Sequence, residues 1–328
     1  MTATLDGAVT LLEDPSFLRG AVWPFVSPRG APPPEALPAV TVHRRRRDGR
    51  LVAEVAFGPS ERVFAKLYPD VVAGAAAYAV HERLWAHGFG AWGRYRTPEP
   101  LAYLPDHGVL LLHAATGEQL SSLPLSGSLD AVRAAARWLA ALHASGVDLD
   151  ASEDAAQGVL RLSRRSATAA AIRPELEEVF RGLLEILAER YARVGARAER
   201  APTQGRFSVE HVFVSPASVT VVDLDRAALA DPAKDVGELL HRLRWRAGKR
   251  GRMSVATDEV GEAFVSEYLR TSRFALSALE YHWSFSVVWT LFVLASEARP
   301  GKGWDERSGF LHAELAAIPA RCAALLGT

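Results

Sequence analysis

Short runs of apolar and β-branched residues separated by turn residues follow one another between residues 39 and 68, a pattern typical of β-strands. The pattern predicts three strands within residues 39–68, with Asp48-Gly49 as a hairpin turn between the first two. Two more strands are expected at 97–103 and 108–113. Residues 75–85 have the composition of a helix. This part of the chain therefore predicts a small antiparallel sheet with one helix.

Beyond residue 114 the apolar side chains follow the helical period instead. Residues 128–143 place them on one helical face, with Ser128 in position to cap the helix. Further helices are expected over 150–200 and from Val236 onwards, and a short hairpin at 213–222 lies between them. The sequence thus predicts an α+β protein in which a small β-rich part precedes a larger, mainly helical part.

The first 38 residues are rich in proline and show neither pattern. Pro32-Pro33-Pro34 and Pro38 exclude a long helix there. We expect residues 1–38 to form an irregular extension packed over one of the two parts, because a solvated tail would be more polar.

The composition is that of an ordinary globular protein with enough apolar residues for a large core. Of 328 residues, 49% are hydrophobic, and the mean hydropathy is +0.02. Thirty-eight basic residues balance 38 acidic ones, so no global field favours nucleic acid or an anionic membrane. Cys322 is the only cysteine, and neither a signal peptide nor a membrane span is evident, since the most apolar stretch, 285–295, is short. A cytoplasmic protein is therefore expected.

Candidate chemistry begins where the second hairpin strand ends. Val222 runs into Asp223-Leu224-Asp225, and Asp231 and Asp235 follow within one short loop. Carboxylates at the end of a strand can hold a magnesium ion that carries phosphates. Lys66 closes an earlier apolar strand, in a chain that otherwise uses arginine for nearly all its cations. It is either a phosphate-binding point charge or a strand lysine whose amine reaches solvent.

These motifs resemble those of the aminoglycoside phosphotransferase and choline kinase-like family, a branch of the protein-kinase-like fold. The similarity covers roughly residues 40–295 and is most specific at Val222-Asp223-Leu224-Asp225 and Asp231-Pro232-Ala233-Lys234-Asp235. It implies a bilobal protein with an N-terminal extension at 1–38, a nucleotide-binding lobe at 39–113 and a catalytic and acceptor-binding lobe at 114–328. His143, at a helix end similar to the family's, is expected to be structural.

The resemblance also implies cofactors and roles for individual residues. ATP and Mg²⁺ are the expected cofactors, with Lys66 on the phosphates, Asp223 as the main metal ligand and Asp225 assisting it. His113 and Ala115 lie at the crossover between the lobes, where the family's backbone groups hold the adenine ring. The family's helix glutamate that pairs with the lysine has only Glu82 as a weak candidate. The partners are a nucleotide and a small-molecule or peptide acceptor.

The loop that precedes the hairpin departs from the family pattern. Arg206 stands in the position of the catalytic aspartate, and His211 in that of the metal-binding asparagine. Arginine cannot accept a proton, and imidazole suits Mg²⁺ poorly. Glu210 is the nearest acid that could replace the base. Loss of a general base costs about 10²–10⁴ in rate, so slow catalysis remains compatible with the sequence.

Three functions therefore compete. The first is a catalytically impaired, pseudokinase-like protein that acts by binding a nucleotide or another small ligand. The second is an active ATP-dependent phosphotransferase with a rearranged base. The third is a nucleic-acid binder that uses the run from His43 to Arg50, and it is the least favoured because the chain has no second basic stripe. The same run would also suit a charged hairpin edge or contacts with nucleotide phosphates.

Overall fold

A computed structural model of the chain describes residues 10–27, 32–46, 48–58, 61–124, 127–194, 199–249, 255–297 and 304–328. The chain divides into two compact units. Unit 1 comprises Met1–Gly117 together with Phe213–Asp225, and unit 2 comprises Glu118–Val212 together with Arg226–Thr328. The hairpin that carries the acidic motif thus belongs to the unit built mainly from the first third of the chain.

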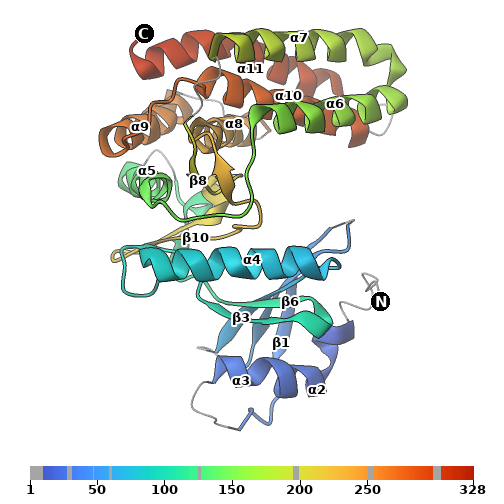
Figure 1. Cartoon of the computed structure of the whole chain (residues 1–328), viewed down its shortest axis with the longest axis vertical. Coiled ribbons are helices and arrows are strands. Elements are labelled where there is room, and N and C mark those ends of the chain that lie inside the picture. Colours follow the sequence, from blue (N-terminus) through green and yellow to red (C-terminus); the bar gives the residue numbers. More distant parts are fainter. Residues whose placement is uncertain are drawn as a thin grey trace. The chain divides into compact units, whose positions relative to one another are not determined.

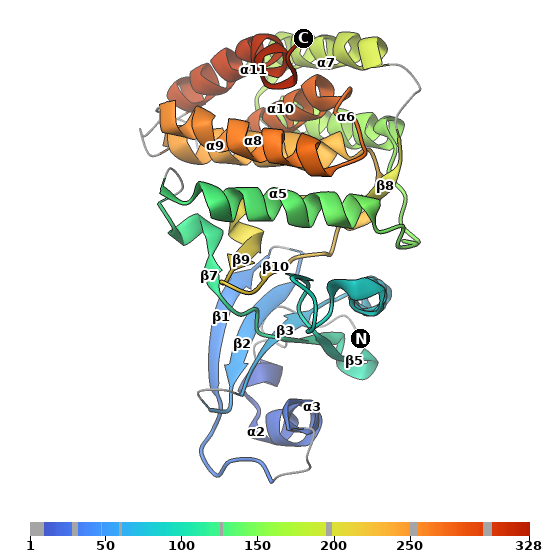
Figure 2. The same ribbon diagram turned by 90° about the vertical axis from the view of Figure 1, so that its left-hand side faces the viewer.

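Unit 1 is built on a five-stranded antiparallel sheet in the order β1-β2-β3-β6-β5. The strands are β1 (Ala39–Arg45), β2 (Leu51–Ala56), β3 (Arg62–Leu67), β5 (Pro100–Leu104) and β6 (Val109–His113). In β2 buried and half-buried residues alternate, as the period of a strand requires. The five predicted strands are confirmed, and Figure 2 shows β1, β2 and β3 side by side. Arg47 lies outside the described residues.

The expectation of an irregular N-terminal extension is wrong for residues 15–26. This segment forms α2 (Pro15–Phe17), a π-helical turn (Leu18–Val22) and α3 (Trp23–Val26), which belong to unit 1 (Figure 1). Phe17, Leu18, Val22, Trp23 and Val26 are buried in one cluster with the apolar face of β2 and β3. Proline is tolerated in the first turn of a helix, and Pro15 and Pro24 occupy such positions.

The opposite face of the sheet meets helix α4 (Val71–Leu84), which starts four residues before the predicted segment and is followed by a π-helical turn (Trp85–Phe89). Asp70 caps α4 by accepting hydrogen bonds from the amides of Val72 and Ala73, at 2.9 and 3.3 Å. Ala77 packs in a small buried cluster with Tyr68 of the lysine strand. This cap and this contact fix α4 beside the face that carries Lys66.

A second sheet contains the hairpin next to the acidic motif. Strand β10 (Val219–Val221) pairs in parallel with β4 (Tyr95–Arg96) and lies beside β9 (Val212–Val214). The Ser215 amide donates to the Ser218 carbonyl at 2.9 Å, which closes the predicted turn. Hence β10 delivers Asp223 and Asp225 into unit 1.

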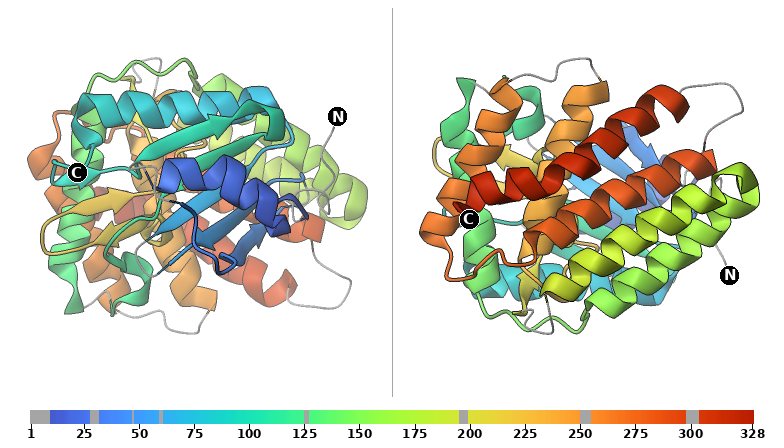
Figure 3. Two further views of the ribbon diagram at one scale, coloured as in Figure 1. Left: turned by 90° about the horizontal axis from the view of Figure 1, so that it is seen from below. Right: turned by 90° about the horizontal axis from the view of Figure 1, so that it is seen from above.

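Unit 2 is mainly helical. Its helices are α5 (Leu129–Ala144), α6 (Ala155–Ile172), α7 (Glu177–Val194), α8 (Ala233–Lys249), α9 (Val255–Thr271), α10 (Leu279–Glu297) and α11 (Trp304–Leu326). Its short strands are β7 (Glu118–Gln119), β8 (Ala201–Thr203) and β11 (Ala228–Ala230), of which the last two pair antiparallel. Helix α10 packs against α6, α7, α8 and α11 (Figure 3, right). The α+β expectation is confirmed, but Ser128 precedes α5 without a side-chain cap.

One segment of α11, Arg307–Leu326, is long and apolar enough to cross a membrane by length and composition. It is the only such helix among the described residues, and it differs from the apolar stretch singled out in the sequence, which lies inside α10. In unit 2 this helix buries Leu311 and Ile318, and its Glu314 accepts a hydrogen bond from Arg244 at 2.9 Å.

Candidate functional site

A single buried cation links the acidic motif to the sheet of unit 1. The Lys66 Nζ atom donates to Asp225 Oδ1 at 2.7 Å and to Asp223 Oδ1 at 3.3 Å. The hydroxyl of Tyr68, two residues further along the chain, donates to the same Asp225 oxygen at 2.9 Å. The lysine side chain is 10% exposed, so its amine does not reach freely into solvent. One cation thus serves two carboxylates.

The local backbone explains how these groups meet. Lys66 and Tyr68 lie two positions apart at the end of β3. Their side chains therefore point to the same face of the sheet. Asp223 follows β10 with a φ of 62°, the only positive φ of a non-glycine residue in the described part of the chain. The left-handed conformation is strained for a residue with a Cβ atom, and such strain concentrates at functional sites. It turns the chain so that Asp225 also reaches Lys66.

Burial and charge act in opposite directions on this cluster. Burial lowers the pKa of Lys66, but the two carboxylates outweigh it and raise the pKa above its ordinary value. Burial and the charge of Asp225 both raise the pKa of Tyr68. Lys66 is therefore charged and Tyr68 neutral over the physiological range of pH.

His81 of α4 is the missed neighbour of this cluster. Its side chain is fully buried, and neither ring nitrogen makes a hydrogen bond of normal geometry, although the Pro98 carbonyl lies close by. Burial, together with the charge of Lys66, lowers its pKa to about 3. The candidate Glu82 is exposed, so α4 presents a neutral histidine rather than a glutamate at this position. The register of α4 could have revealed this, since His81 recurs with the buried Ala77 and Leu84.

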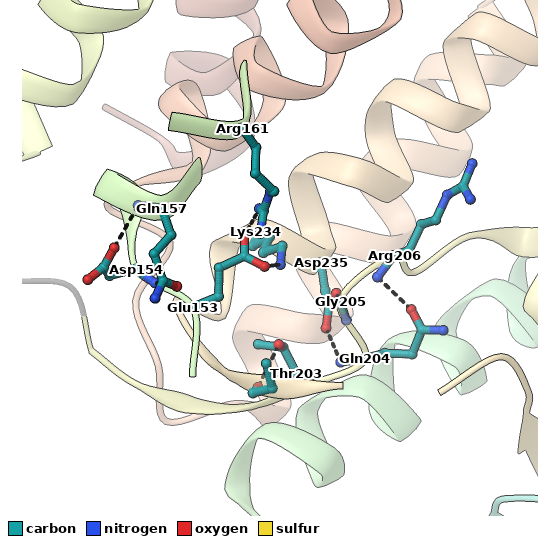
Figure 4. Close-up of polar contacts among 11 residues, drawn as sticks. Glu153, Asp154, Gln157, Arg161, Thr203, Gln204, Gly205, Arg206, Lys234 and Asp235 are labelled. Atoms are coloured by element: carbon teal, nitrogen blue, oxygen red, sulfur yellow. Dashed lines mark hydrogen bonds and ion pairs between the residues drawn. The ribbon is translucent and has the colours of Figure 1, made fainter. Parts of the chain in front are cut away.

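A buried carboxylate, that of Asp235, holds the backbone of the divergent loop of unit 2 (Figure 4). Asp235 accepts from the amide of Gln204 at 2.7 Å and from that of Gly205 at 2.8 Å. Gly205 has a φ of +85°, and a Cβ atom there would lie 2.1 Å from the carbonyl oxygen of Arg226. Only glycine fits this turn. The loop backbone is therefore fixed, and its side chains set the chemistry.

The guanidinium of Arg206, the residue that the sequence resemblance aligns with the catalytic aspartate, lies beside a carboxylate. Its amide donates to Gln204 Oε1 at 2.8 Å, and its Nε lies 3.9 Å from Glu238 Oε1. Figure 4 shows the side chain directed away from Asp235 and Lys234. Glu238 also accepts hydrogen bonds from Arg242 at 2.8 Å and from Ser286 at 2.7 Å. Burial opposes ionisation of Glu238, but Arg242, His241 and these bonds outweigh it and lower its pKa to about 2.

Glu210 and His211 of the same loop also have polar partners. Glu210 lies 3.1 Å from Arg246, and although burial opposes it, hydrogen bonding and this charge lower the pKa of Glu210. His211 Nδ1 lies 3.1 Å from the carbonyl oxygen of Arg206, so that nitrogen donates the hydrogen bond. Arg206, Glu210 and His211 therefore share one loop in unit 2.

His143 is a structural residue, as expected. It is fully buried, and its two ring nitrogens lie 2.7 Å from the hydroxyl of Tyr268 and 3.3 Å from Asp235 Oδ2. It thus helps to hold the carboxylate that supports the loop.

The structure brings together Lys66, Asp223 and Asp225, and adds Tyr68 and His81. His113 ends β6 and pairs with Val63, so the strand period places it on the opposite face of the sheet from Lys66, and Ala115 follows in a half-buried segment. Their proposed role uses backbone groups and stays a prediction. In the described part of the chain, no group of three or more His, Cys, Asp or Glu side chains could hold a metal ion.

Comparisons with known proteins agree with this arrangement. Residues 43–280 match the model of the phosphotransferase enzyme family. No curated protein matches the sequence significantly. The fold is similar to that of an aminoglycoside-3'-phosphotransferase of type VIII, with 20% identity and a TM-score of 0.56 over 77% of this chain and 93% of that one.

Two further solved structures share the fold. The choline kinase LicA from Streptococcus pneumoniae has 12% identity and a TM-score of 0.59, over 86% of this chain and 93% of that one. The amicoumacin kinase hAmiN, in complex with AMP-PNP, Ca²⁺ and Ami, has 11% identity and a TM-score of 0.57, over 86% of this chain and 88% of that one. The sheet, the hairpin, the lysine–aspartate cluster and the helical unit are therefore those of a chain that belongs to the phosphotransferase enzyme family.

Proposed function

We propose that this protein is a catalytically impaired member of the family that acts by binding a nucleotide or another small ligand. The observation that carries the proposal is Arg206 in the position of the catalytic base. Its guanidinium stays protonated and lies beside Glu238, so it cannot accept a proton from an acceptor hydroxyl.

Neighbouring groups supply no ready substitute for the base. Glu210 is the nearest acid in sequence, and its lowered pKa and its pairing with Arg246 make it a weak proton acceptor at neutral pH. His211 uses Nδ1 for the Arg206 carbonyl, and its imidazole is a poor ligand for Mg²⁺.

The donor set in unit 1 fits ATP and Mg²⁺. Asp223 and Asp225 offer the carboxylate oxygens that Mg²⁺ prefers, and Lys66 offers a compact charge for phosphate oxygens. When bound, the metal ion would neutralise the charge of the nucleotide's phosphates. The amicoumacin kinase of the same fold is in complex with AMP-PNP and Ca²⁺, which supports this assignment. The proposal includes a nucleotide-binding role for residues 39–113 and a cytoplasmic location.

An active phosphotransferase that acts on a hydroxyl of a small molecule or peptide is the second candidate. It is favoured by the same cluster, because Lys66, Asp223 and Asp225 are the groups that phosphoryl transfer needs for positioning and charge neutralisation.

Calorimetry with ATP, with and without Mg²⁺, tests the proposal. We expect Mg²⁺-dependent binding by the wild type, its loss in Asp223→Ala and its retention in Asp106→Ala, an exposed aspartate of the same unit. ATP turnover is measured on the same samples and in Arg206→Asp. We expect turnover to be negligible in the wild type and to rise about 10²-fold or more in Arg206→Asp. Fast turnover by the wild type would favour the second candidate, and no binding by any sample would refute a nucleotide site.

A further inference from the structure

A cavity of about 350 Å³ lies wholly within unit 2. Residues of α6, α7, α8 and α10 line it, together with Gly205 and Arg206 of the divergent loop. Its volume lies within the range of small-molecule sites in proteins. The question is which chemistry its lining would recognise.

Cations outnumber carboxylates in this lining. The cationic side chains are Arg161, Arg200, Arg206, Arg226, Lys234 and Arg242. The carboxylates are Glu153, Asp154, Asp231 and Glu238. With histidine neutral, the lining carries a formal excess of two positive charges, in a chain whose total formal charge is zero.

The carboxylates of the lining already pair with groups of the protein. Glu153 is shared by Arg161 and by Lys234, the latter at 2.7 Å, and the two cations converge on it in Figure 4. Glu238 is shared in the same way by Arg206 and Arg242. Each glutamate thus serves two cations.

The two aspartates serve the ends of helices. Asp154 accepts from the amide of Gln157 at 2.8 Å at the start of α6, and Asp231 accepts from the amide of Ala233 at 2.8 Å at the start of α8. Helix N-termini carry partial positive charge, which these carboxylates offset. All four carboxylates of the lining are thus engaged by groups of the protein, which disfavours a cationic ligand.

One wall of the cavity is aromatic. Tyr281, Phe285 and Trp289 succeed one another at helical spacing along α10, and the rings of Phe285 and Trp289 stack with their centroids 6.4 Å apart. Tyr281 is 2% exposed, and its hydroxyl has no hydrogen-bond partner among the described residues. A buried hydroxyl without a partner is costly, so this one is available to a ligand.

We propose that this cavity binds a small anion, a carboxylate or phosphate carried on a flat apolar body. The inference rests on the proposed function, since it names the class of small ligand that unit 2 would hold. Arg161, Lys234 and Arg242 would bind the anionic group, and the wall of α10 would stack on the flat part. Aromatic walls also suit organic cations, but the surplus of arginine disfavours a choline-like or aminoglycoside ligand.

The test uses three probes of one shape: 1-naphthyl phosphate, 1-naphthol and 1-naphthylmethylammonium, titrated into the full chain with EDTA and without nucleotide. We expect the phosphate to bind about tenfold more tightly than the naphthol, the scale of one charge-assisted hydrogen bond in a partly exposed site. We expect the ammonium not to bind, and phosphate affinity to fall as salt is added.

Variants locate the binding. Arg161→Gln should raise the Kd for 1-naphthyl phosphate about tenfold. The matched control Arg181→Gln, on the exposed surface of α7, should leave it unchanged. Trp289→Leu should weaken the phosphate and the naphthol alike.

Several results would overturn the inference. They are tighter binding of the ammonium probe or of kanamycin, no phosphate binding at millimolar concentration, or equal affinity in the wild type and Arg161→Gln. Loss of phosphate binding in Lys66→Gln, with Arg161→Gln unaffected, would place the anion in unit 1 instead. Parallel titration with ATP and Mg²⁺ separates the two proposals, because a failure to bind ATP with naphthyl phosphate still bound refutes only the nucleotide site.

Discussion

The lysine–aspartate cluster of unit 1 and the cavity lining of unit 2 pair their charges in opposite ratios. In unit 1, one cation, Lys66, serves two carboxylates, Asp223 and Asp225. In unit 2, Glu153 and Glu238 each serve two cations. The first arrangement gathers carboxylates around one cation, and the second gathers cations around carboxylates. We propose the first for a metal ion that carries phosphates and the second for an anion.

The comparison also separates what binding requires from what catalysis requires. A charge-matched site can hold a ligand with its cations and carboxylates in fixed places. Proton transfer additionally needs a group that changes its protonation state near neutral pH. Arg206, paired with Glu238, is not such a group. The function we propose follows this division, with charges arranged for binding and an arginine at the position that the resemblance assigns to the base.

Glu238→Gln removes the charge of a carboxylate in the cavity lining of unit 2. Of the predicted changes, it should lower the free energy of unfolding most. Because the folded pKa of about 2 lies below the ordinary value of 4.5, the carboxylate contributes about 3 kcal/mol to the free energy of unfolding at pH 7. That contribution is present above pH 4.5 and is lost as the pH falls towards 2. In urea unfolding, the free energy of unfolding of Glu238→Gln should therefore lie well below that of the wild type at pH 7. The difference should be smaller at pH 3.

The same variant frees Arg206 and Arg242, so affinity for 1-naphthyl phosphate should rise at pH 7. Glu185→Gln, an exposed glutamate on α7, is the control and should unfold like the wild type. An equal deficit at pH 7 and pH 3 would show that Glu238 contributes through its shape rather than its charge.

The lysine–aspartate cluster of unit 1 could be predicted largely from the sequence, because the patterns that indicate it are local. An apolar strand that ends in Lys66, and carboxylates directly after a hairpin strand, are patterns of a few neighbouring residues. The role of Tyr68 follows from the same strand period, although we did not anticipate it. His81 could not be predicted from the family pattern, which has an acid on this helix, although His81 lies on the buried face of α4.

The cavity of unit 2 and its lining could not be predicted from local patterns. Its lining comes from positions between 153 and 289 that only the packing of α10 against α6, α7 and α8 brings together. The 150–200 region was expected to be helical, but no local pattern shows which arginines face a cavity. The loop with Arg206 was identified by its place in a motif, whereas its partner Glu238 lies on the following helix. Charge balance around a cavity is a property of the packed structure.

His81→Leu tests the cluster of unit 1. It should change the pH dependence of the free energy of unfolding by an intermediate amount. The histidine is folded in its neutral form, with a pKa of about 3, beside Lys66 of β3 and Asp223 and Asp225 after β10. The unfolded chain takes up a proton below about pH 6.5, so wild-type stability falls as the pH drops from 6.5 towards 3. Between pH 7.5 and 5.5 this loss amounts to about 1–1.5 kcal/mol, and it should be absent in His81→Leu.

Urea unfolding at the two pH values checks this prediction. His87→Gln, which replaces an exposed histidine just after α4, should keep the wild-type pH dependence. If His81→Leu also kept it, the buried imidazole would have to be protonated in the folded protein, and Lys66 could not be its charged neighbour in the cluster.

Tyr68→Phe should give the smallest effect and tests whether Lys66 alone holds the acidic motif. The change removes only the hydroxyl that donates to Asp225 at 2.9 Å, so the free energy of unfolding should fall by about 1 kcal/mol. Lys66 still bonds both carboxylates, and ATP affinity in the presence of Mg²⁺ should stay within about twofold of the wild type. Tyr78→Phe, at a half-buried tyrosine of α4, is the control for loss of a hydroxyl. A large drop in ATP affinity in Tyr68→Phe alone would mean that the phenol orients Asp225 for the metal, because the stability change is too small to explain it.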